Sequence, residues 1–148
     1  MDYLIKAADK GDLNAVKDAL EKGSDVNVKD SSGWTALMYA SEKGYTEIVK
    51  LLIEKGADVK AKNDFSCNAL MFTKSVEIAK LLIENGTDVN TQNTFGNTIL
   101  MLTADKEIVK LLIDNGANVN IKDYSGWTAL THASKNRRVE IVKILETA

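Results

Sequence analysis

Few residues in this chain could carry out chemistry, and their spacing decides whether they do. There is one cysteine, Cys67, and one histidine, His132. A thiol and an imidazole within hydrogen-bonding reach would supply a nucleophile and its general base. Asp25, Asp58 and Asp88 each precede a valine and could offer carboxylate oxygens to a metal ion. The elements that position these groups must therefore be established first.

An internal repeat in the sequence predicts which secondary-structure elements the chain forms. The stretch 47–59 returns at 77–89 and 107–119, with a degraded copy at 14–26 and an incomplete one at 140–146. A second block, 33–38, recurs at 66–71, 96–101 and 126–131. Repetition at a fixed period predicts stacked copies of one supersecondary unit. We divide the chain into segments one to five, 1–29, 30–62, 63–92, 93–122 and 123–148, within a single domain over 1–148.

Each segment is predicted to form two helices and a projecting loop. The first helix follows a residue that can cap a helix N-terminus, and these residues are Thr35, Asn68, Thr98 and Thr128. The second helix carries a broad apolar stripe and ends at a glycine suited to a left-handed cap, and these glycines are Gly23, Gly56, Gly86 and Gly116. One inward valine then precedes each loop, and these valines are Val26, Val59, Val89 and Val119.

The pattern closely resembles the ankyrin repeat, a unit of about 33 residues whose first helix opens with Thr-Pro-Leu-His. Thr35-Ala36-Leu37-Met38 stands at that place, so alanine replaces the proline and methionine the histidine. The resemblance implies an all-α solenoid of stacked helix-turn-helix units with projecting hairpin loops. It also implies a concave recognition surface made of loop tips and first helices.

Segments three and four are three residues shorter than segment two, and the missing residues fall between the paired helices. Three residues are nearly one helical turn, so the first helices of segments three and four are predicted to be about one turn shorter. The deletion is either a neutral loss at a connection or a notch in the binding face.

At the two ends, Asp18 and Glu146 replace apolar residues. Polar residues there suit outer faces that meet water, so we expect a complete, self-capped chain.

Catalysis is not expected from this layout. Cys67 and His132 lie two segments apart, which corresponds to about 20 Å in a helical stack. Both are interpreted as packing residues, together with Tyr39, Phe72, Met38, Met71 and Met101. The recurring aspartates are expected to bond their local backbone, because carboxylates one segment apart cannot share a metal. We therefore predict no enzyme activity, metal or cofactor.

The charge and composition of the chain exclude some classes of binding partner. Nineteen Lys and Arg residues against 21 Asp and Glu residues give a net charge of −2, so there is no general basic field for nucleic acid or membrane. One cysteine excludes an intramolecular disulfide, and no apolar stretch is long enough for a signal peptide or membrane span. The expectation is a cytoplasmic, monomeric protein.

The predicted function is therefore binding of another protein, which this chain would mask, scaffold or inhibit. Large rigid aromatic side chains at loop tips suit such a role. The resemblance places the following candidate contact residues on the recognition surface: Ser32, Trp34, Asp64, Phe65, Cys67, Thr94, Phe95, Asn97, Tyr124, Ser125 and Trp127. Arg137 and Arg138 form a basic end that could receive an acidic segment. The alternative is a structural protein that self-associates through the aromatic row.

Overall fold

The computed structural model describes residues 2–148 as short helices joined by loops, with no strand in that range. Its contacts divide it into an N-terminal unit, Met1–Thr87, and a C-terminal unit, Asp88–Ala148. The N-terminal unit contains α1 (Tyr3–Lys10), α2 (Leu13–Glu21), α3 (Ala36–Lys43), α4 (Thr46–Glu54), the 3₁₀ helix η1 (Ala69–Met71) and α5 (Val76–Glu84). The C-terminal unit contains α6 (Ile99–Leu102), α7 (Lys106–Asp114), α8 (Ala129–Lys135) and α9 (Val139–Glu146).

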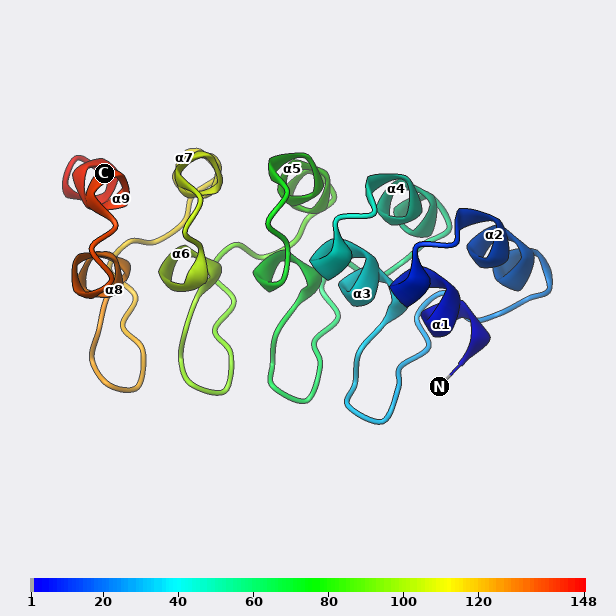
Figure 1. The fold of residues 1–148 in the computed structure, drawn as a ribbon. Helices are drawn as coiled ribbons and strands as arrows, with labels where there is room; N and C mark the ends of the chain where they lie inside the picture. The colour runs from blue at the N-terminus through cyan, green and yellow to red at the C-terminus, as the bar shows by residue number, and fades with distance from the viewer. Residues whose placement is uncertain (1) are drawn as a thin grey trace. The chain divides into compact units, whose positions relative to one another are not determined.

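In the N-terminal unit, first helices pack on first helices and second helices on second helices. Helix α3 contacts α1, α4 and η1, while α4 contacts α2 and α5. Figure 1 shows the loops between successive helix pairs projecting from the side opposite the second helices. Leu4, Leu37 and Leu70 fill the layer between first helices, and each is at most 1% exposed. This arrangement leaves one side of the first helices and the loop tips available for contact.

The C-terminal unit has the same construction. Helix α8 contacts α6 and α9, and α7 contacts α9. Ile108, Val109 and Leu112 form the buried stripe of α7, and Ile141 and Leu145 do so on α9. The apolar spacing of the second helices therefore predicted the buried face correctly.

The predicted helix ends are confirmed in most details. Thr35, Asn68 and Thr128 accept a hydrogen bond from the backbone N–H three residues later, whereas Thr98 occupies the same position without a side-chain cap bond. The four cap glycines predicted at the ends of second helices all have positive φ. Such a backbone favours glycine because it has no Cβ to clash with the following carbonyl.

The first helices of the third and fourth segments are short. Helix η1 has three residues and α6 has four, against eight in α3 and seven in α8. These are the two segments that lack three residues between their paired helices. The chain leaves α6 at Thr103, whose backbone is extended rather than left-handed. Removing one turn thus leaves too little chain for a full first helix.

The core assignments hold in part. Met38, Met71 and Met101 are buried, as predicted, while Tyr39 and Phe72 are half-buried. The predicted inward valines are buried at Val59 and Val89 and half-buried at Val26 and Val119. No helix of residues 2–148 is both long and apolar enough to cross a membrane.

Candidate functional site

Each projecting loop is held by one side-chain oxygen at its base. Oδ1 of Asp30 accepts hydrogen bonds from the backbone N–H groups of Ser32 (2.8 Å) and Trp34 (3.0 Å). The residues at the same position in the other loops are Asn63, Asn93 and Asp123, and each accepts from the N–H groups two and four residues later. The loop tips are consequently fixed turns, whose side chains are presented in defined directions.

The second oxygen of the two aspartates ties the loop to the first helix that follows. Oδ2 of Asp30 accepts from the hydroxyl of Tyr39 at 2.8 Å. Oδ2 of Asp123 lies 2.8 Å from Nε2 of His132. In the two segments with short first helices, the loop residue is the neutral Asn63 or Asn93, and the residue nine positions later is Phe72 or Leu102. The carboxylate is present only where a polar partner meets it.

These pairs were missed at the level of sequence, although a signal existed. Asp is followed nine residues later by Tyr or His, and Asn by Phe or Leu, in all four loops. His132, interpreted as a packing residue, also makes an edge contact with the Trp127 ring, at a centroid distance of 5.3 Å. It therefore both packs and holds the last loop.

The contacts shift the pKa values of these carboxyls. Burial favours the neutral form of Asp30, but hydrogen bonds from Tyr39, Ser32 and Trp34 outweigh it and hold the pKa below its ordinary value. The backbone N–H of Trp127, together with the contacts to His132 and Ser125, holds the pKa of Asp123 below its ordinary value despite burial. Both side chains are thus anchors in their ionised form.

Neighbouring loops are also bonded to each other within each unit. In the N-terminal unit, the N–H of Asp64 donates to the Ser32 carbonyl at 3.1 Å. In the C-terminal unit, the N–H of Tyr124 donates to the Phe95 carbonyl at 3.2 Å. Nε2 of Gln92 adds a bond to the Lys122 carbonyl at 3.2 Å. Adjacent tips therefore form one connected surface in each unit.

In the N-terminal unit, some of the predicted contact residues are exposed and others are buried or half-buried. Ser32 and Asp64 are exposed, and the Phe65 side chain is 54% exposed. Trp34, expected as a free anchor, is half-buried because its ring stacks on Phe72 at a centroid distance of 4.2 Å. It also lies 4.9 Å from the ring of Tyr39.

Cys67 is buried, which agrees with its interpretation as a packing residue and not with its place among the candidate contact residues. The side chain is only 8% exposed, and its thiol is 3.7 Å from the Phe65 carbonyl oxygen, in donor position. Cys67 is therefore removed from the candidate surface.

The C-terminal unit presents the two most exposed of the candidate aromatic side chains. Tyr124 is 77% exposed, Phe95 65% and Trp127 37%. Because Tyr124 and Phe95 belong to loops joined by a hydrogen bond, they are brought together at one surface. Thr94 and Ser125 are exposed beside them, whereas Asn97 is half-buried.

The two arginines at the end of α8 differ from each other. Nη1 of Arg138 donates to the Thr103 carbonyl at 2.9 Å, at the end of the short helix α6, and the side chain is half-buried. Arg137 is exposed and has a φ of 55°, at the position where α3 ends in Gly44 with a φ of 78°. Arg138 is thus a structural link, and Arg137 is the cation presented to solvent.

The other groups considered for chemistry are engaged locally. Asp25, Asp58 and Asp88 accept from the backbone N–H two residues later, as predicted. No group of three or more His, Cys, Asp or Glu side chains within residues 2–148 is arranged to hold a metal ion. The recurring carboxylates therefore act as turn residues.

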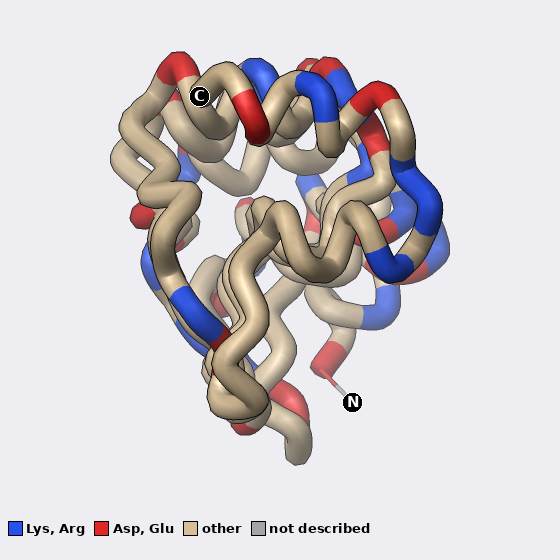
Figure 2. The backbone as a smooth tube through the Cα atoms, turned by 90° about the vertical axis from the view of Figure 1, so that its left-hand side faces the viewer, with Lys and Arg blue, Asp and Glu red and all other residues tan. Residues whose placement is uncertain are grey.

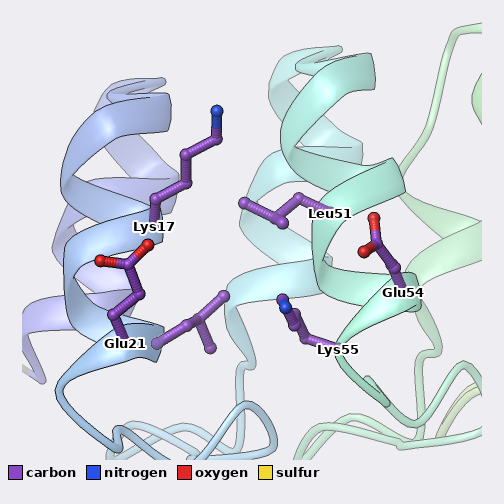
Figure 3. Close-up of a pocket in the computed structure, with 6 residues that line it drawn as sticks. Lys17, Glu21, Leu51, Glu54 and Lys55 are labelled. Carbon is purple, nitrogen blue, oxygen red and sulfur yellow. The ribbon is translucent and has the colours of Figure 1, made fainter.

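The second helices present mixed charge and an open groove. Figure 2 shows Lys and Arg alternating with Asp and Glu along these helices at the top of the view. In the N-terminal unit, a groove between α2 and α4 is lined by Lys17, Leu20, Glu21, Leu51, Glu54 and Lys55. Figure 3 shows Leu51 extending toward α2 between charged side chains of both helices. Because two lysines and two glutamates line it, the groove favours neither an anionic nor a cationic ligand.

Comparison with known proteins agrees with this architecture. A family model described as ankyrin repeats matches residues 4–93 and 66–147. No curated protein matches the chain. The all-helical paired arrangement has the fold class of an ankyrin repeat solenoid, and ankyrin repeat domains generally bind other proteins and are typically non-catalytic. Because the two matches together span residues 4–147, the chain belongs to the ankyrin repeat family.

Proposed function

We propose that this protein binds another protein through its loop tips and first helices and catalyses no reaction itself. The observation that carries the proposal is the exposure of Phe65, Phe95 and Tyr124 at the tips of hydrogen-bonded loops. Exposed aromatic side chains on a fixed backbone are typical anchors of protein interfaces, because they bury a large area with little loss of conformational entropy.

Preorganisation of the loops supports this surface over the second helices. Binding to a mobile loop requires that the loop be ordered, which weakens the complex. Here each tip is already held by two hydrogen bonds to Asp or Asn and by a bond to the adjacent loop. We propose that a monomer in the cytoplasm docks its partner here and thereby masks, scaffolds or inhibits it.

The test compares capture of partners by three forms of the tagged full chain from lysate of the cells that produce it. The tip variant carries Phe65→Ser, Phe95→Ser and Tyr124→Ser. The control variant carries Lys55→Ala, Lys80→Ala and Lys110→Ala, which are exposed positions at second helices. We expect a protein captured by the wild type and the control variant but lost from the tip variant, with all three showing the same circular dichroism spectrum.

Equal capture by the tip variant would place the interface elsewhere and overturn the proposal. Self-association, the alternative function, gives a different result in sedimentation velocity. If the aromatics join copies of this chain, the wild type will sediment faster with rising concentration while the tip variant will not. We expect the wild type to remain monomeric over that range.

A further inference from the structure

Charge in residues 91–148 is divided between the loop and first-helix segments and the second-helix segments. We call residues 91–104 and 121–138, which form the loops and the first helices α6 and α8, the loop face. It contains the cations Lys122, Lys135, Arg137 and Arg138 and the single carboxylate Asp123, a net charge of +3. The second-helix segments, 105–120 and 139–148, contain three lysines and five carboxylates, a net charge of −2. A chain with an overall charge of −2 thus has a basic loop face.

The one carboxylate of the loop face is hidden and compensated. The Asp123 side chain is 8% exposed, accepts two backbone N–H groups at 2.9 Å, and lies 2.8 Å from His132. By contrast, no carboxylate of residues 2–148 lies within ion-pair distance of the exposed Lys122, Lys135 or Arg137. The field outside this face is therefore that of its cations.

Arg137 occupies a backbone position that disfavours any side chain. Its left-handed conformation, with φ at 55°, is the one that Gly11 and Gly44 adopt where α1 and α3 end. A Cβ in this conformation approaches the following carbonyl, so glycine would be more stable here. Strain at an exposed residue that makes no ion pair with any of residues 2–148 points to a use of its charge outside the chain.

The cations and the exposed aromatic side chains belong to the same two segments that make up the loop face. Lys122 comes two residues before Tyr124, and Lys135 lies on α8 after His132, which contacts Trp127. We propose that the loop face binds an acidic segment of the partner protein. Its carboxylates would meet Lys122, Lys135 and Arg137, and its apolar side chains would pack on Phe95, Tyr124 and Trp127. This inference rests on the proposed function and specifies the chemistry of the partner.

An acidic protein segment fits this face better than a nucleic acid. Arginine binds a carboxylate through two parallel hydrogen bonds, which adds direction to the attraction. Nucleic-acid binding depends on neutralising many phosphates. The net charge of the whole chain opposes a long polyanion, and the second helices of this unit are acidic. Because exposed aromatics also stack on unpaired bases, an oligonucleotide is included in the test.

The experiment selects ligands from a random peptide display library on the immobilised full chain. Two variants change the net charge equally on opposite sides of the unit. The face variant is Lys122→Glu, Lys135→Glu and Arg137→Glu, and the control variant is Lys106→Glu, Lys110→Glu and Lys143→Glu. We expect the selected peptides to be rich in Asp, Glu and apolar residues. Their affinity, measured by fluorescence anisotropy, should fall by about tenfold or more in the face variant and by less than about twofold in the control.

Three results would overturn the inference. Selected peptides that are neutral or basic would exclude an acidic partner. Equal weakening in both variants would mean that only the total charge matters. A single-stranded oligonucleotide that competes fully at equal concentration would identify a nucleic-acid surface. If any of these occurs while the natural partner is still lost from the aromatic tip variant, the proposed function stands and only the partner chemistry is wrong.

Arg137 also provides a test in which stability and binding move in opposite directions. Arg137→Gly removes both the strain and the cation, so the melting temperature should rise while peptide affinity falls severalfold. A residue with a purely structural role would not separate the two properties in this way. A higher melting temperature with unchanged affinity would remove Arg137 from the binding surface.

Discussion

The hydroxyl of Tyr39 donates a 2.8 Å hydrogen bond to Oδ2 of Asp30 and so joins α3 to the loop that precedes it. Burial of the phenol, reinforced by the Asp30 carboxylate, raises the pKa of Tyr39 to about 12. The same carboxylate fixes the loop tip through Ser32 and Trp34. The ionisation of one tyrosine is therefore coupled to the geometry of one loop.

This coupling predicts a loss of stability at alkaline pH. Tyr39 ionises more readily in the unfolded chain, where its pKa is about 10, than in the folded chain. Its contribution to stability is thus complete below pH 10 and disappears as pH rises through about 12. Urea unfolding from pH 9 to 12 should show a steeper loss for the wild type than for Tyr39→Phe. Parallel curves would contradict the assignment.

Asn63 and Phe72 offer a second test of the same arrangement. Nδ2 of Asn63 is buried and has no hydrogen-bond partner within residues 2–148, and Phe72 occupies the position that corresponds to Tyr39. Asn63→Asp alone should destabilise by about 2 kcal/mol, because the second carboxylate oxygen, at the place of Nδ2, would be buried without a donor. Adding Phe72→Tyr should recover about 1 kcal/mol in a double-mutant cycle of urea unfolding. Additive effects would show that the short η1 cannot bring the two groups together.

Gly96 and Gly126 form a matched pair in the C-terminal unit. Both have positive φ, near 80° and 84°, so alanine at either position costs about 1 kcal/mol from backbone strain. A Cβ at Gly96 would also lie 2.8 Å from Cδ1 and the backbone N of Tyr124, whereas a Cβ at Gly126 would have no heavy atom of residues 2–148 within 4 Å beyond its own chain neighbours. Thermal unfolding should therefore show Gly96→Ala to be the more destabilising by about 2 kcal/mol. Equal losses would mean that the two loops are not in close contact.

The burial of Cys67 predicts slow reaction with a thiol reagent. With 8% of the residue exposed, modification of the native protein should require opening of the loop or of the N-terminal unit. The rate in native buffer should be at least about a hundredfold below that in guanidinium chloride, and it should rise as urea is added. Native and denatured rates that coincide would return Cys67 to the accessible surface.

The sequence predicts the features that depend on a few neighbouring residues. Thr35 and Thr128 begin helices because a hydroxyl can accept a bond from an N–H three residues later, and Gly56 ends one because it tolerates positive φ. The apolar spacing of α4 predicts a broad stripe, Ile48, Val49, Leu51, Leu52 and Ile53, of which Ile48, Val49 and Leu52 are buried and the other two half-buried. Such features repeat in register, so each copy supports the others.

The features that the sequence did not reveal depend on distant residues. The Trp34 ring is covered in part by Phe72, which belongs to the next segment. Arg138 leaves the candidate surface because the Thr103 carbonyl, 35 residues earlier, accepts its guanidinium N–H. A resemblance to a family gives the general position of a side chain, but the partner that covers it comes from the three-dimensional contact.

The Arg138–Thr103 bond has a consequence for the order in which the C-terminal unit folds. A four-residue helix cannot nucleate alone, because fixing its first turn costs more than one backbone bond returns. Helix α6 therefore has to form on α8 and α9, which supply its packing face and the guanidinium at its end. We therefore expect folding of this unit to start at the C-terminal helix pair and to proceed backward along the chain. The α6 amides should exchange with solvent as fast as that pair opens, so the last segment sets the lifetime of the surface that carries Phe95.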